Sequence, residues 1–173
     1  MPGRRTPGGA SALSFLAASA LSLCAPMHGA WGAQTATATV VLVHDGDTLA
    51  VEIAGGVRIT LHLLGIAAPS VRGVRPRDGR KAVGQPFAEE AKRALEDLVL
   101  AKEVRVFFYG RDAFRQVMAE VFFEGENVSV HMVRGGLARV DRAARNVPET
   151  LRQALEKAEA EAKRDRRGLW MFE

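Results

Sequence analysis

Hydrophobic and polar residues alternate along two runs in the first half of the chain, residues 48–53 and 57–64. A period of two is typical of β-strands with one buried face. Because two adjacent glycines separate the runs, we expect them to form a β-hairpin. An apolar run before the hairpin ends in a His-Asp-Gly-Asp turn at 44–47. The turn places Asp45 and Asp47 at a strand end, where a metal or phosphate site can form.

The second half of the chain is predicted to mix strands with helices. Two runs rich in β-branched and aromatic residues, 104–109 and 117–123, are predicted strands. Helices are expected from Pro86, from about Ser129 to the glycines at 135–136, and from near Pro148. At helical spacing, the buried face of the first comprises Phe87, Ala91, Ala94, Leu95 and Leu98, and that of the last comprises Leu151, Leu155, Ala158 and Ala162.

Residues 1–33 are predicted to be a secretory signal peptide, cleaved at about residues 30–35. Arg4 and Arg5 precede an apolar run at 12–25, and small residues follow it. This run is too short to span a bilayer comfortably, so no transmembrane span is expected in the mature chain. We therefore expect an exported protein, periplasmic or secreted. A general secretory, a twin-arginine and a lipoprotein signal all remain open.

Residues 34–39 are expected to form a polar linker, and residues 40–173 the folded domain. The whole chain has 24 Lys and Arg against 20 Asp and Glu, and removal of Arg4 and Arg5 with the signal peptide leaves 22 against 20. So small an excess does not indicate nucleic-acid binding, and only local clustering of charge can. The single cysteine, Cys24, lies in the predicted signal peptide, so no disulfide is expected in the mature chain.

Several motifs follow one another in a specific order. They are D-G-D-T at 45–48, G-x-P at 84–86, V-R-G-G-L-A-R-V at 133–140 and G-L-W at 168–170. Together with the predicted elements, this order resembles the staphylococcal nuclease family over about residues 40–170. The resemblance implies an α+β, β-rich fold, a five-stranded OB-type barrel with three helices. It also implies calcium-dependent cleavage of DNA and RNA phosphodiester bonds.

Most charged positions that the resemblance assigns to catalysis hold other residues in this chain. The family's first calcium-binding aspartate matches Asp47, but the second falls on Ala67, which Ala68 follows. Its two phosphate-binding arginines fall on His62 and Gln116, and its base glutamate falls on Ser70. Arg115 stands one place before Gln116, and Phe114 takes the place of a tyrosine that contacts the nucleotide.

We therefore expect a nuclease-like domain that has lost phosphodiesterase activity and binds nucleic acid, another polyanion or a protein. The expected ligand-binding cleft comprises Asp47, His62, Phe114, Arg115, Gln116, Arg72, Arg75 and Arg77. Polyanion binding through Lys and Arg would depend strongly on salt. No cofactor is expected, and the protein is expected to be a monomer.

Two other functions stay open. The first is a residual endonuclease, which would either depend on calcium with Asp47 as a vestigial metal ligand, or use His62 as the base and Arg115 as the phosphate clamp. In the other, Asp45, Asp47 and His62, joined by His44, would hold a transition metal.

Some of these residues also have purely structural interpretations. The two aspartates of the 44–47 turn can simply shape it. The sequence Asn127-Val128-Ser129 matches a glycosylation sequon, but it also fits a turn that leads into a helix cap.

Overall fold

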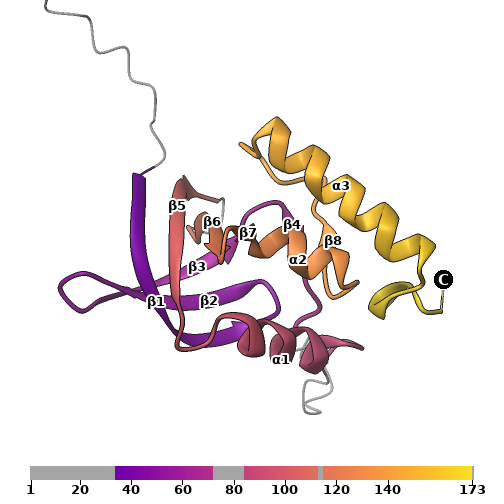
Figure 1. The fold of residues 1–173 in the computed structure, drawn as a ribbon, viewed down its shortest axis with the longest axis horizontal. Helices are drawn as coiled ribbons and strands as arrows, with labels where there is room; N and C mark the ends of the chain where they lie inside the picture. The colour runs from indigo at the N-terminus through magenta and orange to yellow at the C-terminus, as the bar shows by residue number, and fades with distance from the viewer. Residues whose placement is uncertain (1–33, 72–83, 113–114, 173) are drawn as a thin grey trace, which may run out of the picture. The chain divides into compact units, whose positions relative to one another are not determined.

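The computed structural model describes residues 34–71, 84–112 and 115–172. Its main strands are β1 (Gln34–Asp45), β2 (Thr48–Ile53), β3 (Val57–Leu63), β5 (Glu103–Arg111) and β6 (Val117–Phe123). Antiparallel neighbours follow the order β3-β2-β1-β5-β6, and a parallel pairing of β3 with β6 closes the barrel (Figure 1). The α+β class and the predicted five-stranded barrel with three helices are confirmed. The predicted signal peptide lies outside the described residues.

Strand β1 is longer than expected, because residues 34–39 form its first half and not a polar linker. They pair in antiparallel register with residues 103–108 of β5. Ala38 is buried whereas Thr37 and Thr39 are exposed, so the alanine–threonine alternation is itself a strand pattern of period two. The linker expectation was wrong because alanine is too small to mark a buried face strongly.

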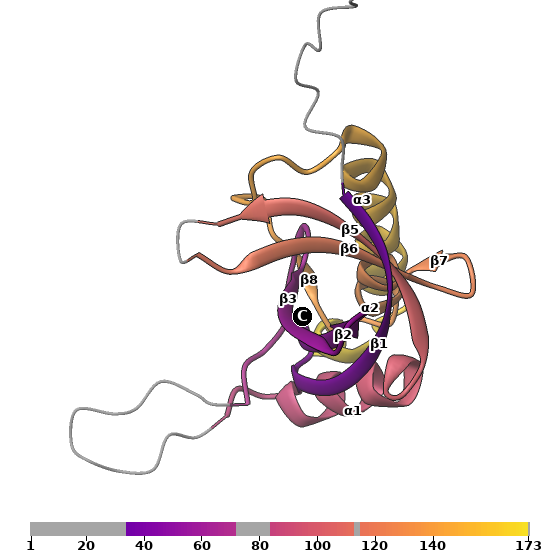
Figure 2. The ribbon, with the colours of Figure 1, turned by 90° about the vertical axis from the view of Figure 1, so that its left-hand side faces the viewer.

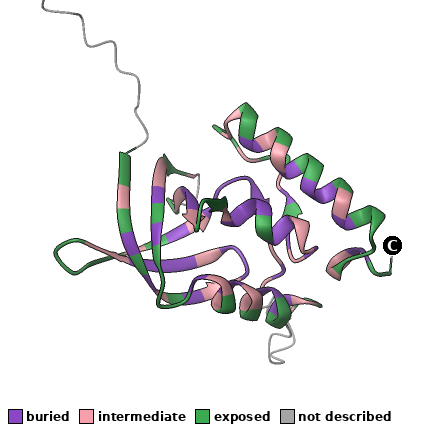
Figure 3. Cartoon of the chain, in the orientation of Figure 1, coloured by how far each residue is buried: buried purple, intermediate pink, exposed green. Residues whose placement is uncertain are grey.

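Of the three α-helices in the described residues, α1 (Ala88–Val99) and α2 (Val128–Arg134) pack on the barrel, and α3 (Glu149–Arg164) packs on α2. Helix α1 lies across one end of the barrel, and α2 lies between β6 and α3 (Figures 1 and 2). The buried residues gather on the inner faces of strands and helices (Figure 3), and the predicted stripe of α3 is buried throughout. Helix α1 begins two residues after Pro86, because Phe87 adopts a left-handed conformation with φ of 65°. None of the described helices is both long and apolar enough to cross a membrane.

Short elements connect the barrel to the helices. Strand β4 (Ile66–Ala67) pairs with β8 (Arg139–Val140), and β7 (Glu126–Asn127) follows β6. Asn127 caps α2, since its side-chain oxygen accepts a hydrogen bond from the N–H of Val130 at 3.3 Å. This contact agrees with the helix-cap interpretation of the sequon.

Two hydrogen-bonded contacts fix the segments that flank these elements. The N–H of Ser70 donates to Gln85 Oε1 at 2.9 Å, and the N–H of Gln85 donates to the Ser70 carbonyl at 3.0 Å. This Ser70–Gln85 clamp joins the residues on either side of 72–83. The second contact lies in the 3-10 turn η1 (Gly168–Trp170), where the N–H of Leu169 donates to the Gly136 carbonyl at 2.8 Å. Trp170 is thereby buried, with 4% of its surface exposed.

Candidate functional site

The acidic turn between β1 and β2 packs tightly against α1. A Cβ on Gly46 would lie 2.7 Å from the Cβ of Ala91 in α1 and 2.9 Å from the Cβ of Ala68. Only glycine therefore fits this approach without a shift of the surrounding backbone. The close packing holds the next residue, Asp47, in a position where only 7% of its surface is exposed.

Both carboxylate oxygens of Asp47 accept hydrogen bonds from the protein. The hydroxyl of Thr48 donates to Oδ1 at 2.9 Å, and the backbone N–H of Ala68 donates to Oδ2 at 2.7 Å. Asp45 plays a similar part, since its Oδ1 accepts a hydrogen bond from the N–H of Val71 at 3.1 Å. Both aspartates thus join the turn to the segment that follows β4, which supports the turn-shaping interpretation.

His62 stands beside this turn on β3, where it pairs in register with Thr48 of β2. The Nδ1 atom of His62 lies 2.9 Å from Thr48 Oγ1 and 3.8 Å from Asp47 Oδ1. A hydroxyl has one proton, and that of Thr48 is donated to Asp47, so Thr48 Oγ1 accepts the Nδ1 proton of His62. A neutral His62 then carries its lone pair on Nε2.

A groove of about 360 Å³ opens where β3 meets the β5–β6 hairpin. Its polar lining consists of Arg58, Thr60, His62, Arg111, Arg115 and Gln116, and we call it the basic groove. The structure thus brings together His62, Arg115 and Gln116 of the expected cleft, with Asp47 directly behind His62. The remaining expected members, Phe114, Arg72, Arg75 and Arg77, lie outside the described residues.

The turn before β6 positions Arg115. Its backbone is left-handed, with φ of 65°, and its N–H donates to the Asp112 carbonyl at 3.0 Å. The N–H of Gln116 donates to Asp112 Oδ1 at 2.8 Å, and Arg111 Nη1 donates to the Arg115 carbonyl at 2.8 Å. The backbone is therefore fixed, while the Arg115 side chain is exposed to solvent in the groove.

Sequence reasoning missed two arginines of the basic groove. Arg58 lies four residues before His62 on β3, and even spacing places both on one face of the strand. Its guanidinium forms an exposed ion pair with Glu52 at 2.9 Å. Arg111 ends β5 opposite Val117, a pairing that depends on the bulge between Phe108 and Arg111 and is not visible in the sequence.

The sequence profile of the family described as "Staphylococcal nuclease homologue" matches residues 60–172. The chain belongs to this family. It is similar to an "Uncharacterized endonuclease" of Haemophilus influenzae, 32% identical over 78% of this chain and 66% of that protein. It is also similar to an "Uncharacterized endonuclease" of Escherichia coli, 29% identical over 86% of this chain and 80% of that protein.

A third relative is longer than this staphylococcal nuclease homologue. It is a "Probable endonuclease LCL3" of Verticillium alfalfae, 35% identical over 66% of this chain and 40% of its own length. The chain therefore spans less than half of that relative, and 66% of the Haemophilus protein. The likeness thus concerns this domain and not the whole of those relatives.

The donor set of this staphylococcal nuclease homologue does not fit calcium. Calcium takes six to eight oxygen ligands, but the expected second aspartate is Ala67 and both oxygens of Asp47 already bond to protein donors. No group of three or more His, Cys, Asp or Glu side chains suited to a metal occurs among the described residues. The transition-metal set of Asp45, Asp47, His62 and His44 is therefore not assembled either.

The side of the barrel that holds Ala67 is mostly apolar. An open hollow of about 490 Å³ is lined there by Ala67, Ala68, Pro69, Phe87 and Leu169, with Gln85, Pro86 and Arg139 at its margins. The staphylococcal nuclease resemblance assigns carboxylate chemistry to this region. In this homologue, small apolar side chains take that place.

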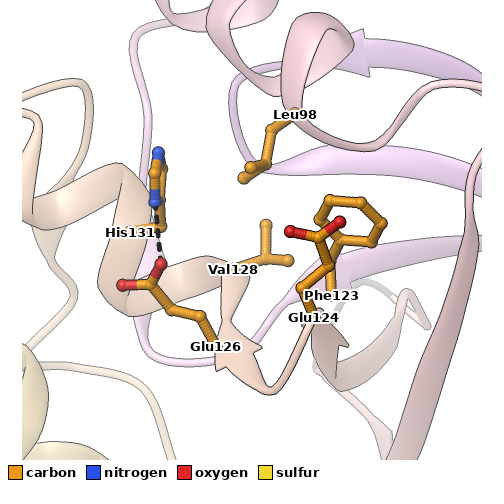
Figure 4. A pocket seen from close by; sticks show the side chains of 6 residues that line it. All are labelled: Leu98, Phe123, Glu124, Glu126, Val128 and His131. Carbon is orange, nitrogen blue, oxygen red and sulfur yellow. Dashed lines mark hydrogen bonds and ion pairs between the residues drawn. The ribbon is translucent and has the colours of Figure 1, made fainter.

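A smaller pocket of about 150 Å³ lies between α1, α2 and the turn after β6 (Figure 4). Glu126 faces it and interacts with His131 Nδ1 at 3.2 Å and with Arg134. The hydrogen bond from His131 is the largest cause that lowers the pKa of Glu126, and Arg134 adds to it, although partial burial opposes both. Because the Glu126 charge already has two partners, we assign this pocket a structural role.

Proposed function

We propose that this staphylococcal nuclease homologue binds single-stranded nucleic acid, or a similar polyanion, in the basic groove and does not cleave it by the calcium-dependent route. One observation carries the proposal. Arg58, Arg111 and Arg115 line a single groove with His62, while the position of the second calcium carboxylate holds Ala67. Attraction for phosphate is thus retained where the metal ligands are missing.

The groove suits a phosphate backbone better than a compact ligand. It is open, its arginines are exposed, and Arg115 presents its side chain from a fixed turn. Arginine forms bidentate hydrogen bonds with phosphate. Such contacts release counterions, so affinity falls steeply as salt rises. A partner protein with an acidic surface would engage the same side chains.

The substitutions at the mouth of the barrel explain why we expect no calcium-dependent cleavage. Ser70 stands at the base position, and a serine hydroxyl is uncharged near neutral pH, so it does not replace the glutamate carboxylate as a base. Gln116 stands at the second arginine position and carries no charge. One arginine that stabilises the transition state of phosphoryl transfer contributes roughly 10³–10⁵ in rate. Loss of the base and of these charges removes most of the reaction.

A residual calcium-dependent endonuclease is the second candidate. Two observations favour it: the relatives in Haemophilus and Escherichia are named endonucleases, and Asp47 remains in place. Arg115, one residue before the position of the family's second phosphate-binding arginine, would then act as the phosphate clamp.

Binding of a fluorescent single-stranded DNA to the full-length protein tests the proposal by anisotropy over a series of salt concentrations. With three arginines in contact, we expect the logarithm of the association constant to fall with the logarithm of salt with a slope of about −2. Arg115→Gln should weaken binding, whereas Arg93→Gln on the exposed side of α1 should not. No binding, or binding that does not respond to salt, contradicts the proposal.

A nuclease assay separates the two candidates. The full-length protein is incubated with DNA with and without calcium, next to its Asp47→Ala variant. We expect no calcium-stimulated cleavage. Strong calcium-stimulated cleavage that Asp47→Ala abolishes would establish the residual endonuclease instead.

We further propose that the protein acts outside the cytoplasm as a monomer without a cofactor. The arginine pair and apolar run of residues 1–33 support export. Sequencing the N-terminus of the protein recovered outside the cytoplasm tests this. A start between residues 30 and 36 is expected, and recovery of the intact chain from the cytoplasm alone would contradict it.

A further inference from the structure

Three side chains form a hydrogen-bonded row that ends in the basic groove. Asp47 accepts the proton of the Thr48 hydroxyl at 2.9 Å, and Thr48 Oγ1 accepts the Nδ1 proton of His62 at 2.9 Å. Binding of a polyanion does not require this row. For binding, a positive charge at position 62 is enough, and an arginine or a lysine would supply that charge without any hydrogen bond to Thr48.

The row determines which ring nitrogen of His62 is free to accept a proton. With its proton held on Nδ1, a neutral imidazole exposes the Nε2 lone pair on the opposite side of the ring. None of the described residues makes a hydrogen bond to Nε2, and His62 lines the basic groove with 22% of its side chain exposed. The Asp47 carboxylate lies on the other side of the ring, with Oδ1 3.8 Å from His62 Nδ1. The arrangement is similar to that of a general base oriented by a carboxylate, except that the Thr48 hydroxyl stands between the imidazole and Asp47.

The same groove holds groups that can stabilise a phosphate as its charge increases. Arg115 reaches it from the turn before β6, and Arg111 from the end of β5. A base and cations at one phosphate suffice for one reaction that needs no metal. In that reaction a ribose 2′-hydroxyl attacks the neighbouring phosphate.

We propose that the basic groove cleaves RNA without a metal, with His62 as the base that takes the proton from the ribose 2′-hydroxyl. This inference rests on the proposed function, because the RNA must first bind in the groove. Arg115 holds the phosphate, and Thr48 and Asp47 are positioning residues that act through His62.

The step is balanced with RNA and water alone. The 2′-hydroxyl proton moves to His62 Nε2, and the 2′-oxygen forms a bond to phosphorus. The bond from phosphorus to the 5′-oxygen of the next nucleotide breaks, and that oxygen takes a proton from water. His62 then returns its proton to the solvent. The products are a 2′,3′-cyclic phosphate and a 5′-hydroxyl.

DNA has no 2′-hydroxyl, so it should bind in the groove and remain intact. Whether a bound strand is cleaved therefore depends on the 2′-hydroxyl of its sugar and not on its base sequence. A DNA strand should act as a competitive inhibitor of RNA cleavage.

The test uses the full-length protein in excess EDTA with an end-labelled RNA, the DNA of the same sequence and the 2′-O-methyl RNA. We expect cleavage of the RNA only, with 2′,3′-cyclic phosphate ends, and binding of all three. His62→Gln should reduce the rate at least 10²-fold, because a general base contributes roughly 10²–10⁴. His131→Gln, at the other described histidine with an acidic partner, should leave the rate unchanged.

The positioning role of Thr48 is tested by comparing kcat with RNA binding, because a purely structural role would not lower kcat alone. Thr48→Val keeps the size of the side chain but removes the hydroxyl, and it should lower kcat about tenfold or more while binding of the 2′-O-methyl RNA is unchanged. Thr48→Ser restores the hydroxyl and should recover kcat. Melting curves of both variants establish that the barrel is folded.

Each outcome distinguishes the inference from the proposed function. Binding of the 2′-O-methyl RNA without cleavage of RNA overturns the inference and leaves the proposed function standing. Failure to bind any of the three strands overturns both. Cleavage that His62→Gln does not change marks a contaminating ribonuclease and also overturns the inference.

Discussion

Asp47 and Glu159 are both buried carboxylates, but they lie in different surroundings. Glu159 on α3 is 2% exposed and accepts hydrogen bonds from the Val140 N–H at 3.0 Å, from Arg142 at 2.8 Å and from Lys163 at 3.1 Å. Asp47 accepts its hydrogen bonds from one hydroxyl and one backbone N–H, and within the described part of the chain the only basic group paired with it is His62, which is charged only when protonated. One carboxylate is compensated by charge and the other by dipoles.

The compensation around Glu159 extends through the C-terminal region. Burial pushes the pKa of Glu159 upward, but the hydrogen bonds from Arg142, Val140 and Lys163 together outweigh burial and leave this pKa below its ordinary value. Lys163 and Arg139 also lie over the ring of Trp170, at 4.4 Å and 4.2 Å from its centroid. These contacts connect α3, β8 and η1 into one unit.

The difference shows which charges the fold requires. Around Glu159, charged partners from a helix and a loop hold elements together, and loss of one weakens the compensation of a carboxylate that is almost fully buried. Around Asp47, the two donors are the Thr48 hydroxyl and the Ala68 N–H, and neither hydrogen bond involves a side chain at position 62, 67 or 70. The mouth of the barrel can therefore exchange its charged residues without loss of the fold.

The strongest test of this comparison breaks the C-terminal unit with Gly136→Ala. Gly136 has φ of +69°, and a Cβ there would lie 2.1 Å from the Arg167 carbonyl oxygen. Backbone strain and overpacking together should cost roughly 2–5 kcal/mol in urea unfolding. Gly125→Ala is the matched control, since it has φ of +86° but no atom within 4 Å of the added Cβ. Equal losses in the two variants would show that the close contact is unimportant.

Exchange of each carboxylate for its amide should have a smaller effect. Glu159→Gln should lower the free energy of unfolding by about 1–2 kcal/mol at neutral pH, because it loses two charge-assisted hydrogen bonds. Asp47→Asn, with neutral donors, should lose less than about 1 kcal/mol.

The loss at Glu159 should depend on pH. Because the pKa of Glu159 is lowered in the folded state, its stabilisation is present above the ordinary value of 4.5 and disappears as the pH falls through the folded pKa. Wild type and Glu159→Gln should therefore converge in acid, as measured by urea unfolding over a pH series. A difference between them that grows in acid would contradict the assigned hydrogen bonds.

The smallest expected effect is that of calcium on the melting temperature. A ligand raises stability only at concentrations comparable with its dissociation constant, and Asp47 alone does not provide a calcium site. Millimolar calcium should therefore leave the melting curve unchanged. Ala67→Asp adds a carboxylate at the exposed second position and should introduce a shift. A shift in the wild-type protein would show that a calcium site persists.

Most of the fold could be predicted because its elements have strong periodic patterns. The α3 stripe and the hairpin of β2 and β3 follow directly from residue spacing. The first half of β1 was missed because its buried position is held by alanine. The closing pair of β3 and β6 joins Leu61 to Val117, a contact between distant segments that no local pattern encodes and that only the family resemblance implied.

The candidate site was predicted in part. His62, Arg115 and Gln116 were found by alignment of motifs, and they do meet in one groove. Arg111 was missed because a bulge in β5 directs it there. The row from Asp47 through Thr48 to His62 was also missed, because it depends on a register across two strands and not on spacing along one.

The Ser70–Gln85 clamp has a practical consequence for engineering. Because both ends of residues 72–83 are fixed by hydrogen bonds outside that segment, the separation of its ends does not depend on what is inserted between them. An affinity tag or a fluorescent reporter inserted within residues 72–83 would thus lie between two points that the Ser70–Gln85 clamp holds together.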